Sequence, residues 1–351
     1  MSLPNIDTDY LLDFLVRLLN TPSPTGFAAQ AIDLTAKALS AFPDLTLTHN
    51  RKGALLAEWP GRSAAAPRAL TAHVDTLGAM VKEIKANGRL RLSPLGGFAW
   101  NTVEGEGLTV FTSSGDQVRG SLLLHKASSH VFGSAQVRDL KRDEESMEVR
   151  LDARTTSAEE TRKLGIQVGD FVAFDPRVEV TQGFIRSRHL DDKACVACMV
   201  AAVKAMHDAG LKPAQRTHYL ISNYEEVGHG ASTGFPPDLA ELLTVDMAAI
   251  GEGQESDEFH ATLCVKDSGG PYHHELSQRL RRLAQENHIA YKVDIYPYYG
   301  SDGEAYWRAG GDVAVALIGP GVDASHSYER THLDALIATT QWILAYLLAE
   351  D

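Results

Sequence analysis

Histidine and carboxylate residues follow several short apolar runs of this sequence. The run "ALTA" leads into "HVD", "HYLISN" into "YEE", "LLTV" into an aspartate, and "VAVALIG" into "PGVDASHSYER". Two further aspartates open the segment "DDKACVACMVAAVKAM". The residues concerned are His73, Asp75, Asp191, Asp192, Glu225, Glu226, Asp246 and His326. So many carboxylates repel one another unless a cation lies between them, and the set therefore predicts bound metal.

The mixture of ligand types narrows the choice of metal. Imidazole combined with carboxylate suits zinc, cobalt or manganese better than magnesium or calcium, which prefer oxygen ligands. Two ions about 3.5–4 Å apart need one bridging carboxylate and about two further protein ligands each. We therefore expect two divalent ions, most simply zinc, with cobalt or manganese as alternatives. A single His or Asp at a strand end usually has only a structural role, so the prediction depends on the whole set.

Two stretches of alternating helices and strands must bring these residues together. Near the N-terminus, helical spacing in "DTDYLLDFLVRLLN" and over residues 27–41 precedes strands at "LTLTH", "ALLAEW" and "RALTAHVD". A second stretch begins with a helix at the two aspartates and alternates from "THYLISN" to "LDALIATTQWILAYLLAE". This alternation is typical of an α/β domain with a mostly parallel sheet covered by helices. Functional residues gather at the carboxyl ends of such strands, so we expect one shared rim.

Between these stretches, from about residue 77 to residue 184, the pattern changes. Short strand-like pieces are separated by Gly, Ser and charged turns, and no convincing amphipathic helix is longer than "SAEETRKLG". The segment predicts a small all-β, barrel-like domain inserted into the α/β domain. The expected division is residues 1–76 and 185–351 for the two parts of the α/β domain, and 77–184 for the insertion.

Composition excludes several classes of partner. The chain has 46 acidic and 33 basic residues, whereas nucleic acids and anionic membranes require clustered Lys and Arg. No apolar run approaches the ~20 residues of a membrane span. The start "MSLPNIDTDY" lacks the basic and apolar segments of a secretion signal. We expect a cytoplasmic protein that binds neither nucleic acid nor membrane.

Cys195 and Cys198 form a CxxC motif that could suggest a redox pair or half of a zinc site. With Cys264 the chain has three cysteines, too few for a disulfide framework at this length, and no second CxxC exists. Because "CVACMVAAVKAM" has helical apolar spacing, we expect Cys195 and Cys198 to be small core residues.

In their order along the chain, the HxD, DD, EE, Asp and His motifs resemble those of the co-catalytic two-metal aminopeptidases. Within that group the chain is similar to peptidase family 42, the glutamyl aminopeptidase and tetrahedral (TET) aminopeptidase group. The resemblance extends from "TPSPTG" through "SRHLDDK" and "EEVGHGAS" to "SHSYERTH". It implies a dinuclear metal-dependent aminopeptidase that hydrolyses the N-terminal peptide bond of short peptides.

The resemblance also implies which residues hold the metals. His73 and Asp246 would bind one ion, and Glu226 and His326 would bind the other. Asp191 would bridge the two, because the family places the bridging residue first in the pair of aspartates.

Further residues would support the ligands and the reaction. Asp192 would support Asp191 from behind, and Asp75 would hydrogen-bond the His73 ring and fix its tautomer. Glu225, bound to neither metal, would be the general base: it takes a proton from the metal-activated water and returns it to the leaving amine. The free α-amino group of the substrate could also bind a metal, which would select N-terminal residues.

Other functions use the same ligand set. In the family of carboxypeptidases, dipeptidases and acyl-amino-acid deacylases, the extra domain enters between later ligands, whereas here the β-rich segment lies between Asp75 and Asp191. This position favours the aminopeptidase over a metal-dependent deacylase or dipeptidase of N-acyl or modified amino acids. A second alternative is a catalytically inactive metal-binding assembly protein, although neither the expected base nor the expected bridge is missing.

The sequence departs from the family pattern beside the site. Thr76 stands where an acidic residue is usual, Lys193 makes the DDR-like element DDK, and His229 occupies a position that is more often aliphatic or basic. No ligand is lost, but substrate preference is left open. The chain looks closer to a bacterial subgroup associated with small osmoprotectant peptides, so a short or modified dipeptide is an alternative substrate. The family also implies a homo-oligomer, from a dimer to a hollow tetrahedral dodecamer.

Several polar residues near the motifs fall outside the expected ligand set. We expect His273 and His274 to lie on the surface, because adjacent residues at a helix start point in different directions. His229 and His332 are near ligands in sequence and could touch substrate or support the ligands. Asp302 in "YYGSDGEAYW" either caps a short helix or lies at the rim of the site.

Overall fold

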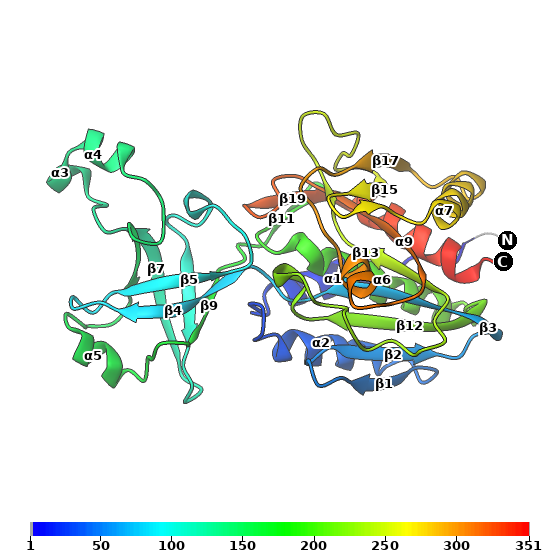
Figure 1. The fold of residues 1–351 in the computed structure, drawn as a ribbon, viewed down its shortest axis with the longest axis horizontal. Coiled ribbons are helices and arrows are strands. Elements are labelled where there is room, and N and C mark those ends of the chain that lie inside the picture. Colours follow the sequence, from blue (N-terminus) through cyan, green and yellow to red (C-terminus); the bar gives the residue numbers. More distant parts are fainter. Residues whose placement is uncertain (1–2, 351) are drawn as a thin grey trace. The chain divides into compact units, whose positions relative to one another are not determined.

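A computed structural model describes residues 3–350, which form two compact units (Figure 1). The first unit contains the chain up to Asp75 and from Arg177 onward, and the second spans Thr76–Pro176. The return to the first unit therefore comes earlier than the expected residue 185. The reason is a small sheet in which β11 (Phe184–Ser187) pairs with both β10 (Glu179–Thr181) and β19 (Glu329–His332) of the first unit.

Four parallel strands form the centre of a ten-stranded sheet in the first unit. Their order is β12 (Gln215–Ser222), β3 (Ser63–His73), β13 (Glu241–Val245) and β18 (Ala314–Val322). Burial on both faces explains their continuous apolar runs, such as "ALTA" in β3 and "VALIG" in β18.

Shorter strands extend this sheet on both sides. β2 and β15 run antiparallel to their neighbours β12 and β18, so the whole sheet is mixed although its centre is parallel. The flanking strands are β1 (Thr46–His49), β2 (Leu55–Trp59), β14 (Ala248–Ala249), β15 (Ala261–Asp267), β16 (Gly270–Pro271) and β17 (Tyr291–Ile295).

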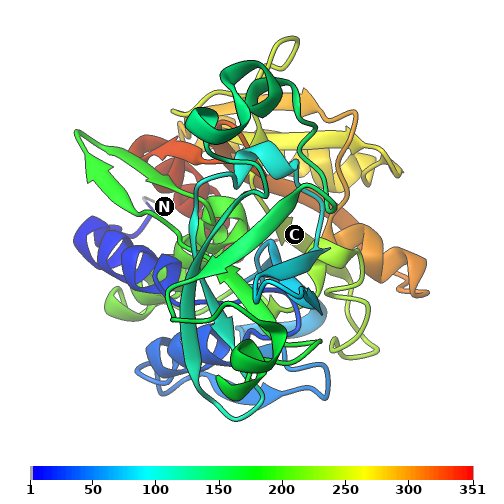
Figure 2. The ribbon, with the colours of Figure 1, turned by 90° about the vertical axis from the view of Figure 1, so that its left-hand side faces the viewer.

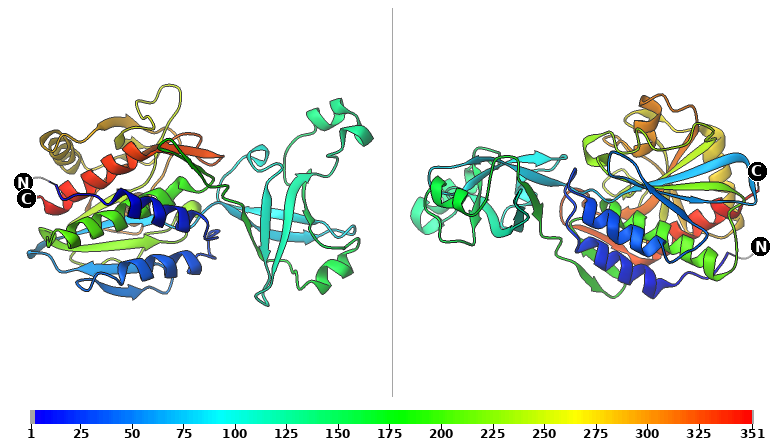
Figure 3. Two further views of the ribbon diagram at one scale, coloured as in Figure 1. Left: turned by 180° about the vertical axis from the view of Figure 1, so that it is seen from behind. Right: turned by 90° about the horizontal axis from the view of Figure 1, so that it is seen from below.

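Helices cover both faces of the sheet. One face carries α6 and α9, with α1 packed against α6 and α7 against α9, whereas α8 lies on the opposite face (Figure 3). The helices of this unit are α1 (Thr8–Leu19), α2 (Ala29–Leu39), α6 (Leu190–Asp208), α7 (His274–Glu286), α8 (Asp302–Arg308) and α9 (Leu333–Leu348). The unit is therefore the expected α/β domain.

Helix α6 lies between the sheet, α1 and α9, and it is buried on almost every side. The small residues of α6 allow this close packing. Because α6 is surrounded by other elements, it has no polar face toward solvent. Cys195 and Cys198 are fully buried free thiols in this helix, which confirms that they are core residues.

The second unit is a closed barrel of six strands with its own apolar core. Figure 2 shows the ribbon of this unit. Alternate residues point inward, as along β7, where Leu122 and Leu124 are fully buried. The strands, in barrel order, are β4 (Gly78–Ile84), β5 (Leu90–Leu95), β8 (Met147–Leu151), β7 (Gln117–Leu124), β6 (Gly107–Phe111) and β9 (Phe171–Phe174). The inserted β barrel expected from the sequence is confirmed.

Short helices lie at the ends of the barrel. α3 (Ser129–Phe132) and α4 (Ser134–Asp139) are at one end, and α5 (Ala158–Lys163) is at the other (Figure 1). The helix α5 is the one expected at "SAEETRKLG", and Ser157 caps its N-terminus. Across residues 3–350, no helix has the length and apolar character needed to cross a membrane.

Candidate metal centre

The four central strands end at one rim, and each leads into residues of the candidate site. β3 ends with His73 itself, β13 is followed directly by Asp246, and β18 leads into the loop that carries His326. β12 ends at Ser222, which pairs in register with His73, so the Glu225-Glu226 turn begins beside the end of β3. The shared rim expected from the sequence exists because neighbouring parallel strands end at the same edge of the sheet.

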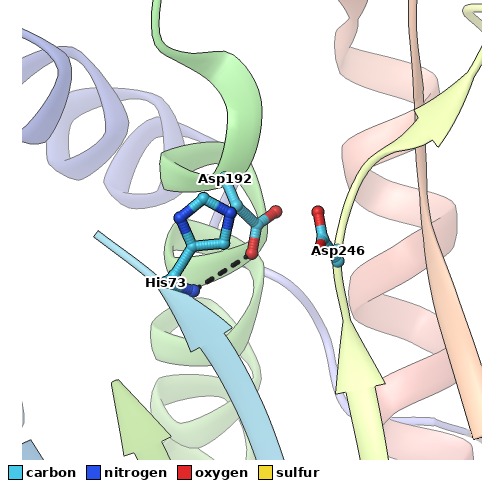
Figure 4. Close-up of side chains that lie close together, drawn as sticks. All are labelled: His73, Asp192 and Asp246. Carbon is cyan, nitrogen blue, oxygen red and sulfur yellow. Dashed lines mark hydrogen bonds between the residues drawn. The ribbon is translucent and has the colours of Figure 1, made fainter. Parts of the chain in front are cut away.

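Two groups of potential ligand atoms lie at this rim. In each group, one ligand atom per residue lies within 4.8 Å of the others. The groups are His73, Asp192 and Asp246, and Asp191, Glu226 and His326. Figure 4 shows the first group, with Asp192 and Asp246 directing their carboxylates toward each other beside the His73 ring. This donor set of imidazoles and carboxylates fits zinc and similar divalent ions.

Asp191 connects the two groups. Its Oδ1 lies 3.3 Å from His73 Nε2, and its Oδ2 lies 3.5 Å from His326 Nε2. Glu226 Oε2 is also 3.5 Å from His326 Nε2. One carboxylate thus reaches both imidazoles, one with each oxygen, which is the geometry that a bridging ligand requires.

Asp192 belongs to the first group of potential ligands. It is fully buried, and its Oδ2 accepts a hydrogen bond from the His73 backbone N–H at 3.2 Å, drawn as the dashed line in Figure 4. Burial and the nearby Asp246 raise the pKa of Asp192 well above its usual value. Asp192 therefore both anchors the end of β3 and offers a carboxylate to the first group.

Asp75 makes a different contact with His73 from the one expected. His73 Nδ1 lies 2.9 Å from the backbone carbonyl oxygen of Asp75 but 3.6 Å from its carboxylate. The buried carboxylate instead accepts hydrogen bonds from the Thr25 hydroxyl at 2.7 Å and from the backbone N–H of Glu225 at 3.2 Å. The ring is therefore oriented by main chain, and the side chain of Asp75 holds the start of the Glu225-Glu226 turn.

That turn has a tight backbone conformation. Tyr224 and Gly228 flank it with φ angles of +76° and +85°, a region that glycine enters without steric cost. Two residues further on, a Cβ at Gly230 would lie 2.2 Å from the Asp302 side chain, so only glycine fits there. The backbone after the two glutamates is thus packed directly against Asp302.

Asp302 is a buried structural residue. Its Oδ1 accepts the backbone N–H of Ala231 at 2.7 Å, and its Oδ2 accepts the hydroxyls of Thr71, at 3.1 Å, and Ser222. It therefore ties β3, β12 and the loop after the glutamates to the first residue of α8. The sequence had left its role open between helix cap and rim residue.

Glu329 is a residue that the sequence reasoning missed. It is fully buried at the start of β19, and its Oε1 accepts the backbone N–H of His326 at 3.1 Å. His326 itself has a φ of +64°, which is unusual for a residue with a side chain. The buried carboxylate thus supports an otherwise unfavourable backbone conformation. The only sequence signal was an acidic residue shortly after the histidine.

The electrostatics of the rim reflect the crowding of its carboxylates. Burial, reinforced by neighbouring carboxylates, raises the pKa of Glu226 to about 8 and that of Asp246 to about 7. Burial also raises the pKa of Glu225 well above its usual value. Burial acts in the same direction on Asp191, but hydrogen bonds with His326 and His73 outweigh it and lower the pKa of Asp191. Bound cations would offset this repulsion.

A cavity of about 570 Å³ opens at the rim. Asp191, Glu225, Glu226, Asp246 and His326 form part of its wall. The remainder comes largely from the segment before and within α8 and from the residues that follow β13 and β18. The cavity therefore gives a small molecule direct access to the second group of potential ligands and to Asp246 of the first.

The other histidines noted in the sequence belong to neither group. His273 caps α7 through the Leu276 backbone N–H, and His274 is exposed, as expected for surface residues. His229 is exposed and stacks on Tyr224. His332 accepts the Asp334 backbone N–H at 3.2 Å and so caps α9.

Sequence comparisons place the chain among peptidases. The sequence model of the M42 glutamyl aminopeptidase family matches residues 53–342. The chain is 47% identical over 337 residues to YhfE of Bacillus subtilis (strain 168), whose name describes an aminopeptidase, with 96% of each protein covered. It is 26% identical over 247 residues to the lysyl aminopeptidase of Pyrococcus furiosus, covering 67% of this chain and 66% of that protein.

Solved structures share the fold. Aminopeptidase APDkam598 from the archaeon Desulfurococcus kamchatkensis has a TM-score of 0.87 and 22% identity, covering 98% of this chain and 96% of that one. The TET1 peptidase of Pyrococcus horikoshii, described as assembling into a tetrahedron or a large octahedral shell, has a TM-score of 0.84 and 19% identity. The match covers 97% of this chain and 100% of that one. At these identities the likeness concerns the fold.

Proposed function

Because the chain belongs to the M42 glutamyl aminopeptidase family and is a peptide-bond hydrolase, we propose that it is a dinuclear metal-dependent aminopeptidase of short peptides. The observation that carries the dinuclear site is the position of Asp191, whose two oxygens face His73 and His326. In the proposal His73 and Asp246 hold one ion, Glu226 and His326 hold the other, and Asp191 bridges them.

Asp191 is preferred to Asp192 as the bridge for a geometric reason. The oxygens of Asp191 each face a different imidazole, whereas Asp192 Oδ2 already accepts the His73 backbone N–H. Asp192 remains close enough to His73 and Asp246 to add a carboxylate to the first ion. The chemistry of the donor set supports zinc, with cobalt and manganese as alternatives.

Two divalent ions at this rim would activate a water molecule and stabilise negative charge on the carbonyl oxygen of the substrate. Glu225 is proposed as the general base. Its side chain is 14% exposed, Glu225 lies in the cavity wall, and its Oε2 is 3.6 Å from His73 Nε2. Burial raises the pKa of Glu225, which makes its carboxylate a stronger proton acceptor, and in the proposal it takes a proton from water and returns it to the leaving amine.

The positioning of Glu225 depends on its backbone. Asp75 accepts the Glu225 backbone N–H, and the next N–H, that of Glu226, is 3.4 Å from the same carboxylate. Consecutive side chains leaving a turn point in different directions, so one glutamate can face His326 while the other stays available for proton transfer. The separate contacts of Glu226 with His326 and of Glu225 with His73 support this division of roles.

We also propose that the protein is a homo-oligomer in the cytoplasm. The fold is that of TET peptidases, and two solved TET1 structures are described as a dodecamer and as a tetrahedron or large octahedral shell. Size-exclusion chromatography with light scattering measures the assembly directly, and a stable monomer would contradict this part of the proposal.

The activity is tested with a panel of free aminoacyl p-nitroanilides, dipeptides and tripeptides. Purified protein is treated with a chelator and then reconstituted separately with zinc, cobalt or manganese. We expect hydrolysis of substrates with a free N-terminus, loss on chelation and recovery with at least one metal. Activity confined to N-acyl amino acids would favour a deacylase instead. Absence of chelator-sensitive activity across the panel would favour an inactive metal-binding protein.

A further inference from the structure

Arg308 is the last residue of α8 and forms part of the cavity wall. Its side chain is 60% exposed. Arg308 and His326 are the basic residues among those described as lining the cavity, and the His326 ring already faces Asp191 and Glu226. Among the described lining residues, Arg308 therefore carries the permanent positive charge, and it is not one of the proposed metal ligands.

The guanidinium of Arg308 has few partners within the protein. Its one ion pair within residues 3–350 is with Glu304 Oε2 at 3.6 Å, which is too long for a hydrogen bond. By contrast, Arg330 makes two hydrogen bonds to Glu258, at 2.6 and 2.8 Å. A guanidinium carries five N–H donors in a planar fork, so Arg308 retains the donors for a second carboxylate.

Glu304 forms an ion pair with Arg308 but accepts no hydrogen bond from it. It lies one helical turn earlier on α8 and is buried, whereas Arg308 is exposed and lines the cavity. Burial and the neighbouring Asp267 raise the pKa of Glu304 to about 7, so near neutral pH this carboxyl is not fully charged. Its attraction for Arg308 is correspondingly weaker than that of an ionised carboxylate.

The other charged residues of the cavity wall are mostly acidic, so the presence of a basic residue bears on which substrates can bind. Asp191, Glu225, Glu226 and Asp246 contribute carboxyl groups to the same wall, and those that are ionised would repel an anionic substrate. Bound metal would offset part of this charge at the rim. A substrate carboxylate placed elsewhere in the cavity would still need its own positively charged partner.

We propose that Arg308 forms a subsite for a carboxylate of the substrate and binds it through two parallel, bidentate hydrogen bonds. The inference rests on the proposed peptidase function and deepens it, because it defines the substrate class as short peptides with a carboxylate within reach of the cleaved bond. On such a peptide this carboxylate is either the C-terminus of a di- or tripeptide or an acidic side chain. A cavity of about 570 Å³ is within the usual range for small ligands.

The test compares substrates that differ only in one carboxylate. One pair is a dipeptide and its C-terminal amide, and the other pair is the p-nitroanilides of glutamate and glutamine. Both are measured with wild type, Arg308→Gln, Arg308→Lys and the control Arg282→Gln, which changes an exposed arginine on α7. Thermal unfolding of each variant shows that it is folded.

We expect the wild type to favour the acid over its neutral partner in one pair. Arg308→Gln should reduce that preference in kcat/KM by about 10- to 100-fold, mainly through KM, because charge-assisted hydrogen bonds are lost. Arg308→Lys should give an intermediate value, since it keeps the charge without the fork. Arg282→Gln should match the wild type.

The outcomes separate the possible explanations. A change limited to the dipeptide pair identifies the C-terminal carboxylate, and a change limited to the glutamate pair identifies the side chain. If the wild type hydrolyses peptides but Arg308→Gln alters neither ratio, the subsite is wrong while the proposed function stands. If the wild type hydrolyses no substrate in the panel, the proposed function fails and this inference fails with it.

Discussion

The fully buried Glu329 accepts a hydrogen bond at its Oε2 from the backbone N–H of Asp191 at 3.1 Å. The other oxygen of the same carboxylate accepts the His326 backbone N–H. One buried side chain therefore sets the distance between two chain segments that are remote in sequence and carry proposed metal ligands. Glu329 belongs to neither group of potential metal ligands, so we expect it to position the ligands rather than to bind metal.

Replacing Glu329 with Gln should loosen both segments. The amide turns one acceptor into a donor that faces a backbone N–H, so one of the two hydrogen bonds is lost. We expect about 10- to 100-fold weaker metal binding, as is usual for groups that orient ligands, with a matching loss of activity at limiting metal. Competition with a chelating dye measures the affinity. The control Glu179→Gln, on exposed β10, should stay within about two-fold of wild type. Equal metal affinity in both variants would rule out this role for Glu329.

Glu225→Gln should retain metal and lose catalysis. The amide preserves the size of the side chain but cannot take the proton from water, so kcat should fall by about 10²–10⁴-fold. Metal content by elemental analysis should equal that of the wild type, whereas the companion variant Glu226→Gln should bind less metal. Near wild-type turnover in Glu225→Gln would refute its assignment as the base.

Gly230→Ala should destabilise the protein and impair the site. The added Cβ would lie 2.2 Å from Asp302 Oδ1, and that side chain cannot move freely because Thr71, Ser222 and Ala231 hold it. We expect a loss of about 1–3 kcal/mol in unfolding free energy, measured by denaturant titration. The control Gly251→Ala meets no neighbouring atom within 4 Å and should have little effect. Equal stability of the two variants would show that the turn is more adaptable than its packing indicates.

Without metal, the protein should become less stable as pH rises from 5 to 7. Folding raises the pKa of Glu226 to about 8 and of Asp246 to about 7 from unfolded values near 4, so the folded state binds more protons in this window. The stabilisation is complete below the unfolded values and is lost as pH rises through the folded ones. His73, whose pKa is also raised despite its burial, contributes in the same direction.

Thermal unfolding of metal-free and metal-loaded protein at pH 5, 6 and 7 checks this sign. Lys193, with a pKa lowered by burial to about 7, acts in the opposite direction but mainly above this window. The metal-loaded protein should show a shallower or reversed slope, since metal binding requires ionised carboxylates. A Tm of the metal-free protein that rises from pH 5 to 7 would contradict the raised pKa values.

The sequence by itself determined the two architectures and the candidate ligands. Apolar runs that lead into His73, Glu225 and Asp246 indicate strand ends, because the hydrophobic pattern and length of a strand are local properties of the sequence. The barrel was recognisable from its short strands and turns. Strand β15 was overlooked, and its place in the sheet depends on parallel pairing with β17 and antiparallel pairing with β18.

The tertiary structure alone decided which groups hold the site in place. Asp75 turns its carboxylate to the backbone of Glu225, Asp302 joins two strands to a loop, and Glu329 joins Asp191 to His326. Arg308 likewise reaches the cavity only through the position of α8. These contacts link residues far apart in sequence, and local patterns carry no information about which distant donor a buried carboxylate will meet. Buried polar groups need hydrogen-bond partners, but which partner each one has is decided only when the fold brings distant segments together.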